Sequence, residues 1–417
     1  MKLKLILQKS LFRGYGMLTP YETALDLLLE RVERLPTERV LLWDAVNRVL
    51  AEDVFADRDS PAFDNSAMDG YAVVSQDLEE IPAKLKVVGE VSAGSEFSGR
   101  LERGQAIRIF TGAPIPVGAN AVVPVEYTKL EGEYVLIERS FKEGANIRRR
   151  GEEIKAGELI LKKGIKIRGY EVGLLAFVNK VFVEVYQKPR VAVLSTGDEI
   201  KEPGEPIEKP SQIRSTNNHL LYARTRELGC EVHQLGIIRD EPESIKDALQ
   251  RVEDYNVFIT TGGVSAGEKD FVHKLVKDMG FEVVFHKLRI KPAKPVLFAK
   301  RGRTLFFGLP GNPVSCAMAF DMLVKPALLK MQGVEEHRPK FLKAELLRDF
   351  SRRDAERREF VRARYMEKEG KLFCDYSPKT QSHMLTSYVD ANCYMVVYEG
   401  VHELKAGQQV DIVPFDW

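Results

Sequence analysis

Apolar and polar positions follow a strand–helix rhythm in the second half of the chain. The apolar run RVAVLST at 190–196 is followed by helical spacing at about 215–228, and Gly229 suits the end of that helix. The same order recurs along the segments EVHQLGII, NVFITT, FEVVFHKL, PVLFAK and TLFFGL, and a last helix starts at 313. Strands and helices that alternate at this length predict a parallel sheet with helices on both faces.

Elsewhere the apolar segments are short and are separated by glycine, proline and asparagine. This pattern, from 52 to about 185, predicts β-rich structure, and from about 336 onwards it predicts a small β-barrel or sandwich. Helical spacing appears at 21–32, at about 42–51 and at 167–178. The residues Thr19-Pro20-Tyr21-Glu22 form the pattern of a capping box at the start of the first of these helices.

Composition excludes several classes of protein. The 417 residues include 62 Lys and Arg and 61 Asp and Glu, a formal net charge of +1, which argues against a protein whose main partner is nucleic acid. Four widely spaced cysteines without a C-x-x-C pair argue against a zinc ribbon or a disulfide scaffold and suit a reducing cytosol. We find no apolar run that could span a bilayer and no signal-peptide pattern, so we expect a cytoplasmic protein without membrane contact.

Two glycine-containing loops with carboxylates follow predicted strands. The loop at 195–199 could be an ordinary polar connection, or its Glu199 could hold a hard cation. In the loop at 260–270, adjacent glycines would let backbone N–H groups approach an anion, while its carboxylates could cap the next helix or bind Mg²⁺. This loop matches neither a Walker A motif nor G-x-G-x-x-G, which argues against nucleotide hydrolysis and dinucleotide redox chemistry. The candidate residues of the second loop are Gly262, Gly263, Ser265 and Asp270.

A basic segment and a rigid turn follow. A basic run is usually a solvated face, but two prolines stiffen HKLRIKPAKP, so we interpret it as a fixed cationic site for an anionic substrate. The turn GLPGNPVS contains more glycine and proline than a helix cap requires and suits contact with a phosphate or a pterin ring. The candidate residues of the two segments are Lys287, Lys291, Lys294, Pro310, Gly311, Asn312 and Pro313.

Three polar segments stand out in the β-rich stretch. FDNSAMDGYA at 63–72 clusters turn-forming residues without a clean turn pattern and has two carboxylates, so we interpret it as an active-site loop. FTGAP at 110–114 and NIRRRGEE at 146–153 are similar outliers. The three consecutive arginines indicate an anion contact, although surface charge or a subunit contact would also explain them.

Together these segments resemble the molybdopterin molybdenumtransferase family, the bacterial MoeA proteins and the gephyrin E domains. Eight strings match the family pattern in order: FDNSAMDGYA, FTGAPIP, NIRRRGEEI, STGDEI, GIIRDEP, TTGGVSAGEKD, KLRIKPAKP and GLPGNPVS. The resemblance implies an α/β multidomain protein. Its expected units are a helical linker domain at 17–51 and 150–180, an inserted β-rich domain at 52–149, a molybdopterin-binding parallel α/β sandwich at 181–335 and a C-terminal β-barrel at 336–417.

The resemblance also implies a reaction and an assembly. The family inserts molybdate into adenylylated molybdopterin with Mg²⁺-dependent release of AMP, downstream of a molybdopterin adenylyltransferase. Each active cleft is built between the α/β domain of one subunit and the β-rich domain of the other in a homodimer. Chemistry of this kind needs positioning and charge stabilisation more than a strong nucleophile.

Individual residues are carried over by their match to the family motifs. The resemblance implies active-site roles for Asp69, Thr111, Glu153, Glu199, Asp240 and Asp270, of which Glu199, Asp240 and Asp270 are the expected Mg²⁺ ligands. It implies substrate contacts for Lys287, Lys291 and Ser382. One departure is that the family usually has Asp where this chain has Glu153, a side chain one methylene longer.

Three alternatives remain open at this point. The fold could serve as a scaffold that anchors a receptor, or it could bind molybdopterin without inserting a metal. The slightly high charged fraction of 29% is a weak sign of a thermophile, in which case tungstate could be the physiological oxyanion.

Overall fold

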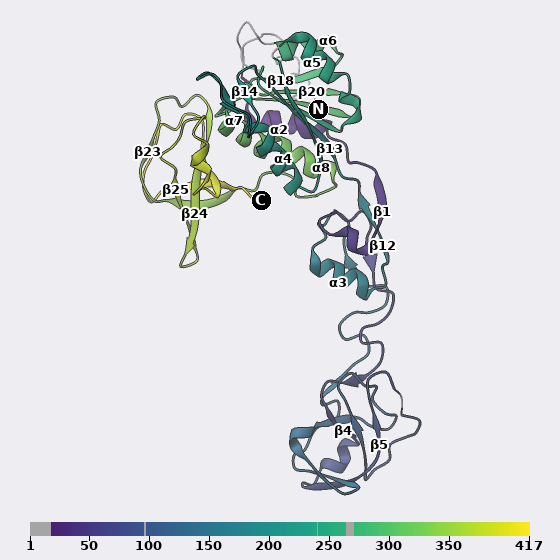
Figure 1. Cartoon of the computed structure of the whole chain (residues 1–417). Helices are drawn as coiled ribbons and strands as arrows, with labels where there is room; N and C mark the ends of the chain where they lie inside the picture. The colour runs from purple at the N-terminus through teal and green to yellow at the C-terminus, as the bar shows by residue number, and fades with distance from the viewer. Residues whose placement is uncertain (1–17, 96, 240, 264–270) are drawn as a thin grey trace, which may run out of the picture.

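The structure, a computed structural model, describes residues 18–95, 97–239, 241–263 and 271–417. Figure 1 shows an α/β unit with the C-terminal β unit beside it, a small middle unit, and a β-rich unit at the far end of the molecule. The chain leaves the α/β unit after its first described helix, passes through the middle unit to the β-rich unit, and returns by the same route. No described helix has the length and apolar character needed to cross a membrane.

The α/β unit is built on a six-stranded sheet in the order β16-β13-β17-β21-β20-β18. The first four strands are parallel, as predicted, whereas β20 runs antiparallel to both of its neighbours, β21 and β18. Only two residues, Gly302 and Arg303, connect β20 to β21, which suffices for a hairpin but not for a crossover helix. The strands are β13 (Arg190–Thr196), β16 (Glu231–Ile238), β17 (Val257–Thr261), β18 (Glu282–His286), β20 (Leu297–Arg301) and β21 (Thr304–Leu309).

Helices cover both faces of this sheet, as predicted. Alternate side chains of β13 point to opposite faces, so Val191 and Val193 lie in one core and Ala192 and Leu194 lie in the other. The first core includes α2, α4, α7 and α8, and the second includes α5 and α6. The helices are α2 (Tyr21–Arg31), α4 (Asn217–Glu227), α5 (Pro242–Leu249), α6 (Phe271–Asp278), α7 (Pro313–Ala319) and α8 (Lys325–Met331), with a π-helical turn, η5 (Phe320–Val324), between the last two.

Helix α2 differs from the expectation in its place and in its start. The Tyr21 hydroxyl donates to the carbonyl of Met322 over 3.3 Å, so the helix packs on the α/β unit rather than on the linker expected for 17–51. The predicted capping box is wrong, because no side chain caps the helix. Thr19 instead pairs with Leu288 in a β-bridge.

The middle unit contains little helix. The helix predicted at 42–51 is wrong beyond a 3₁₀ turn, η1 (Leu42–Ala45), since Val49 and Leu50 form β-bridges with Lys166 and Val185. Helix α3 (Gly169–Phe177) agrees with the prediction at 167–178. The remaining elements are the antiparallel pairs β1 (Thr37–Leu41) with β12 (Phe182–Tyr186), and β2 (Val54–Phe55) with β11 (Leu159–Leu161).

The β-rich unit is a six-stranded sheet in the order β7-β4-β6-β5-β9-β8, with a separate pair of β3 and β10. Buried side chains fill both of its faces. The elements are β3 (Asn65–Ser66), β4 (Gly70–Val73), η2 (Ser75–Leu78), β5 (Ala83–Val91), β6 (Gln105–Ile109), β7 (Ala121–Pro124), η3 (Val125–Tyr127), β8 (Thr128–Glu131), β9 (Tyr134–Ile137) and β10 (Ile147–Arg148).

The C-terminal unit is a closed barrel of β24, β25, β22, β28 and β26, in which β26 returns to pair with β24. This confirms the prediction of a small barrel. A short strand of the α/β unit, β19 (Ile290–Lys291), pairs with β24 and so ties the two units together. The elements are β22 (Leu342–Leu346), β23 (Phe350–Ser351), β24 (Arg358–Lys368), β25 (Lys371–Tyr376), η6 (Leu385–Tyr388), β26 (Cys393–Val397), β27 (Glu403–Leu404) and β28 (Gln409–Pro414); the α/β unit also has β14 (Ile200–Lys201), β15 (Ile213–Arg214) and η4 (Val252–Asp254).

Candidate active site

The carboxyl ends of β13, β17 and β21 lie side by side. Ser195 is in register with Thr261, and Thr261 with Leu309. The loops that follow these three strands therefore leave the same edge of the sheet, where ligands bind in open α/β folds. Strand β16 ends beside Thr196 and brings a fourth loop, which leads to position 240, to this edge.

Two of these loops touch through glycine. Gly262 has a φ of +93°, and a Cβ on it would lie 2.6 Å from the carbonyl oxygen of Thr196. A Cβ on Gly311 would lie 3.9 Å from the Cα of Gly262. Only glycine allows this approach at 262, so the loops that follow β13, β17 and β21 come close through their backbones at this edge.

Asparagines at the start of α4 connect the loops of this edge, and no motif in the sequence indicated them. Asn217 Nδ2 donates to the carbonyl of Gly311 over 2.7 Å. The Ser195 hydroxyl donates to Asn218 Oδ1 over 2.6 Å and lies 2.7 Å from the Thr261 hydroxyl. Two consecutive asparagines in the first turn of a predicted helix are the signal that could have identified them.

Predicted residues of the α/β unit gather around this edge where the structure describes them. Gly263 follows Gly262, and Pro310 and Asn312 flank Gly311 at the start of α7, whose first residue is Pro313. The Glu199 side chain is exposed beside this edge. The candidates Asp240, Ser265 and Asp270 lie outside the described residues. Within the described part of the chain, no three His, Cys, Asp or Glu side chains form a group that could hold a metal ion.

The basic segment reaches the C-terminal barrel. Lys291 Nζ lies 3.0 Å from Glu359 Oε1 of β24, and the Glu359 side chain is buried. Lys287, with a φ of +72°, is half-buried, and Lys294 is exposed. A barrel loop also meets the glycine–proline turn, because the N–H of Val314 donates to the carbonyl of Ser382 over 3.1 Å.

A buried arginine of the barrel shapes that loop. Arg362 is only 1% exposed and donates to the carbonyls of Lys379 and Gln381 over 2.7 and 3.2 Å. Its Nε donates to the Ser387 hydroxyl over 3.0 Å. The sequence gives no sign of this role, because Arg362 stands in an alternating strand pattern where a charged residue is expected to face solvent.

A second group of predicted residues lies in the β-rich unit. The N–H and the hydroxyl of Thr111 both donate to Asp69 Oδ1, over 2.7 and 2.8 Å. These bonds favour the ionised carboxylate and hold the pKa of Asp69 below its usual value. Both residues are exposed, and Gly70 is closely packed against β7 beside them, since a Cβ there would lie 1.9 Å from the carbonyl oxygen of Val123.

The arginine-rich segment folds onto the same loop. β10 pairs with β3, which places Ile147 and Arg148 against Ser66 and Asn65. The backbone N–H of Arg150 and the guanidinium of Arg149 donate to Asp64 over 2.8 and 2.7 Å and hold the pKa of that carboxyl below its usual value.

Glu153 lies in the connection between β10 of the β-rich unit and β11 of the middle unit. Its Oε2 accepts a hydrogen bond from the Ser60 hydroxyl over 2.9 Å, and its N–H donates to the Ser60 carbonyl over 3.0 Å. The neighbouring Asp59 binds the N–H of Ala156 and the guanidinium of Arg150, which lower its pKa. Some arginines of the segment therefore already have carboxylate partners within the chain.

The two groups do not meet within one chain. The β-rich unit, which carries Asp69 and Thr111, lies at the opposite end of the molecule from the α/β unit, with the middle unit between them (Figure 1). One chain therefore keeps the predicted residues in two separate groups.

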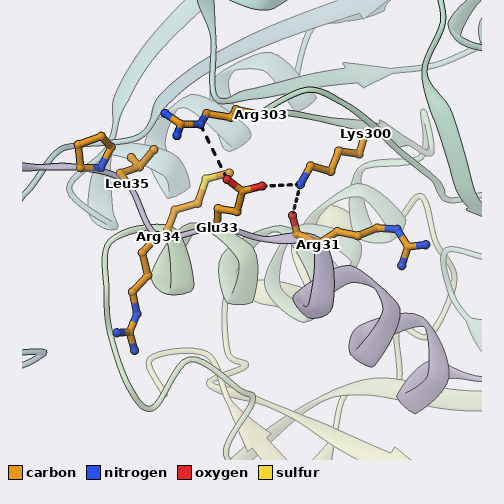
Figure 2. A pocket seen from close by; sticks show the side chains of 8 residues that line it. Arg31, Glu33, Arg34, Leu35, Lys300 and Arg303 are labelled. Carbon is orange, nitrogen blue, oxygen red and sulfur yellow. Dashed lines mark hydrogen bonds and ion pairs between the residues drawn. The ribbon is translucent and has the colours of Figure 1, made fainter. Parts of the chain in front are cut away.

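A pocket elsewhere on the α/β unit is not part of either group. It is lined by Arg31, Glu33, Arg34, Leu35, Pro36, Lys300, Arg303 and Met331. Figure 2 shows the Glu33 carboxylate between Lys300 and Arg303, and Lys300 Nζ lies 2.9 Å from Glu33 Oε1. Lys300 is paired with Leu305 at the beginning of β21, so this pocket opens at the edge of the sheet opposite the loops described above.

Family comparisons cover most of the chain. Residues 19–178 match the MoeA N-terminal region (domain I and II), residues 192–330 match a probable molybdopterin binding domain, and residues 343–415 match the MoeA C-terminal region (domain IV). A molybdopterin molybdenumtransferase of Haemophilus influenzae is 36% identical over 92% of this chain and 96% of its own. One of Bacillus subtilis is 35% identical over 90% of this chain and 89% of its own.

A solved structure has the same architecture. The molybdopterin biosynthesis MoeA protein of Pyrococcus horikoshii is 31% identical, and it aligns with a TM-score of 0.81 over 95% of this chain and 100% of its own. The likeness includes all the units described above.

Proposed function

Because the chain belongs to the molybdopterin molybdenumtransferase (MoeA) family and is a transferase of molybdenum cofactor biosynthesis, we propose that it inserts molybdate into adenylylated molybdopterin and releases AMP. The observation that carries this proposal is the meeting of three loops at one sheet edge, where the backbones of Gly262 and Gly311 approach each other. The basic segment leads to the same edge, since Leu297, at the start of β20, pairs with Gly308. The relatives are named as transferases, which favours an enzyme over a scaffold or a carrier.

The α/β edge would bind the anionic substrate. Gly263, Gly311 and Asn312 would offer backbone N–H groups to the phosphates, together with the hydroxyl of Ser265. Gly262, whose N–H donates to the carbonyl of Leu309, would let the two loops approach, and Pro310 and Pro313, which have no N–H, would make the turn rigid. Lys287, Lys291 and Lys294 would supply positive charge to the pyrophosphate and the oxyanion. Ser382 would border the same space, since its carbonyl is held by the start of α7.

A divalent cation fits the donor set proposed for this edge. Glu199, Asp240 and Asp270 are all carboxylates, the oxygen ligands that Mg²⁺ prefers, and the side chain of Glu199 is exposed. When bound there, Mg²⁺ would neutralise charge on the phosphoanhydride that is cleaved. The protein's own part is to hold the carboxylates and the lysines around one space.

The active cleft would be shared between two subunits of a homodimer. Asp69, Thr111 and Glu153 of one subunit would complete the α/β edge of the other, because one chain does not bring them together. The middle unit exposes several large apolar side chains, which would be covered in such an interface. We call them together the middle-unit apolar surface: Trp43, Val46, Phe55, Leu159, Tyr170, Leu174, Phe177, Val181 and Phe182.

The substrate would come from a molybdopterin adenylyltransferase in the cytoplasm, since an adenylylated pterin is not a starting metabolite but the product of such a transfer. The first test is AMP release from adenylylated molybdopterin with Mg²⁺, with molybdate, with tungstate and without either. AMP release that depends on molybdate supports the proposal. Pterin binding without AMP release contradicts it, and a preference for tungstate would contradict molybdate as the oxyanion.

The shared cleft has a test of its own. Asp69→Ala and Glu199→Ala should each be inactive, but mixing the two after dissociation should restore activity, because each mixed dimer has one cleft with both wild-type halves. Half of the dimers are mixed and each has one active cleft of two, so about a quarter of wild-type activity is expected. A mixture that stays inactive would show that both residues act within one subunit or not at all.

A further inference from the structure

Three helices of the α/β unit end in the same way. Helices α4, α6 and α8 are each followed, after one residue, by a glycine in the left-handed region: Gly229 with φ +79°, Gly280 with φ +82° and Gly333 with φ +80°. The N–H of each glycine donates to a carbonyl in the last turn of its helix, over 2.9 to 3.0 Å. As helix ends the three glycines are equivalent.

They differ in what lies against them. A Cβ on Gly280 would have no neighbour within 4 Å. A Cβ on Gly229 would lie 3.4 Å from the carbonyl oxygen of Asn47, and a Cβ on Gly333 would lie 2.2 Å from Cε2 and 2.7 Å from Cζ of Tyr186. Asn47 and Tyr186 belong to the middle unit, so two of the three glycines form the surface on which that unit sits.

Other contacts hold Tyr186 in place. Arg48, only 7% exposed, donates to the carbonyl of Tyr186 over 2.8 Å. The N–H of Tyr186 donates to the carbonyl of Val49 over 3.0 Å. On the second connection between the units, the N–H of Leu35 donates to the carbonyl of Met331 over 2.8 Å. These bonds hold the backbone of Tyr186 at the end of β12, the position from which its ring meets Gly333.

We propose that the contact of Tyr186 with Gly333 is a positioning joint that sets the direction of the middle unit and, through it, of the β-rich unit. The β-rich unit lies at the far end of the molecule from this contact (Figure 1), so a small rotation at Tyr186 displaces Asp69 by a larger distance. The inference rests on the proposed shared cleft, in which Asp69 must reach the partner's α/β edge. Catalytic geometry tolerates little displacement, since about 1 Å costs on the order of 100-fold in rate.

The test uses the matched glycines. Gly280→Ala and Gly333→Ala impose the same backbone strain, but only Gly333→Ala brings a methyl group against the Tyr186 ring. Gly280→Ala is expected to keep kcat for AMP release within about twofold, whereas Gly333→Ala should lower kcat by about 10- to 100-fold with little change in KM. In a Tyr186→Ala background, adding Gly333→Ala should have no larger effect than Gly280→Ala.

A distance measurement separates orientation from catalysis. The native cysteines are buried, so spin labels can be placed at Lys129→Cys in the β-rich unit and Lys274→Cys in the α/β unit, in labelled chains diluted with unlabelled protein. Gly333→Ala should shift the distance distribution, and Gly280→Ala should not. Tyr186→Ala should broaden the distance distribution and lower kcat. This variant therefore tests the same contact if Gly333→Ala does not fold.

Two results would contradict the proposal that the contact of Tyr186 with Gly333 sets the direction of the units. One is a Gly333→Ala variant that behaves like Gly280→Ala in distance and in kcat. The other is a shifted distance with wild-type kcat, which would show that orientation set at this contact does not govern the cleft. If the wild-type protein itself releases no AMP, the proposed function fails, while the distance comparison still tests the contact.

Discussion

Two hydrogen bonds from Thr111 fix the Asp69 carboxylate and favour its ionised form. Asp69→Ala should lower oxyanion-dependent AMP release by about 100-fold or more while the oligomeric state is unchanged. Asp77→Ala is the matched control, because Asp77 lies in the same unit and also accepts a backbone hydrogen bond, from Gly104 over 2.7 Å. Near-wild-type activity of Asp69→Ala would remove this residue from the proposed site.

Ionisation of the same carboxylate predicts an acid limb in the pH–rate profile of AMP release, with activity lost as pH falls. Hydrogen bonds from Thr111 lower the pKa of Asp69, and the ionised form is lost as pH falls through that pKa. Thr111→Val removes the hydroxyl donor but keeps the backbone N–H, so the pKa should rise towards its usual value. The acid limb of the pH–rate profile should then move to higher pH, and an unmoved limb would mean that Asp69 does not titrate in the rate-determining state.

Glu153 tests how closely its carboxylate must be placed. Glu153→Asp shortens the side chain by one methylene and gives the residue usual in the family, so we expect activity to stay within about threefold. Ser60→Ala removes the hydroxyl that donates to Glu153 Oε2 without shortening the arm. If Glu153→Asp is inactive and Ser60→Ala is not, the length of the arm matters and the family residue is not equivalent in this chain.

Strand β19 is bound to the barrel through a buried carboxylate of β24 as well as through strand pairing. Glu359 lies 3.0 Å from Lys291 and 3.4 Å from Arg352, whose side chain is 3% exposed. Glu359→Gln should lower the free energy of unfolding by about 3 kcal/mol, because it leaves a buried arginine without a counter-charge. Glu403→Gln changes an exposed residue of β27, 3.6 Å from Lys405, and should alter the free energy of unfolding by less than about 1 kcal/mol in the same urea titration. Equal effects of the two changes would contradict the role of Glu359.

Elements were predictable where the pattern is local. The strands of the α/β sheet follow from continuous apolar runs, and α3 follows from its apolar spacing. The antiparallel direction of β20 was missed although its two-residue link to β21 is a local sign of a hairpin. The β-bridges of Val49 and Leu50 were missed because their partners, Lys166 and Val185, are distant in the sequence. The motifs predicted the candidate site residues from their chemistry. They did not predict that Asn217 and Arg362 hold neighbouring loops in place, since both donate to backbone carbonyls that only the fold brings near.

At the scale of the whole molecule, the motifs fall into two places that one chain keeps apart (Figure 1). The family resemblance assigns FDNSAMDGYA to the β-rich domain and TTGGVSAGEKD to the α/β domain, whereas the motifs taken by themselves do not indicate how far apart they lie. The direction of the units relative to one another depends on a few tertiary contacts, such as that of Tyr186 with Gly333. Such contacts have no periodicity that a sequence pattern could reveal.

The middle-unit apolar surface is the proposed interface between the two subunits. Trp43 is 67% exposed in a single chain, and a glutamate at this position would place a charge in the proposed interface. Trp43→Glu should therefore yield monomers in light scattering, with unchanged circular dichroism, and should lose AMP release because Asp69 no longer reaches a partner's cleft. Val389→Glu is the control, since Val389 is 79% exposed but lies in the C-terminal unit. A Trp43→Glu protein that remains dimeric and active would place the interface elsewhere, and an active monomer would contradict the shared cleft itself.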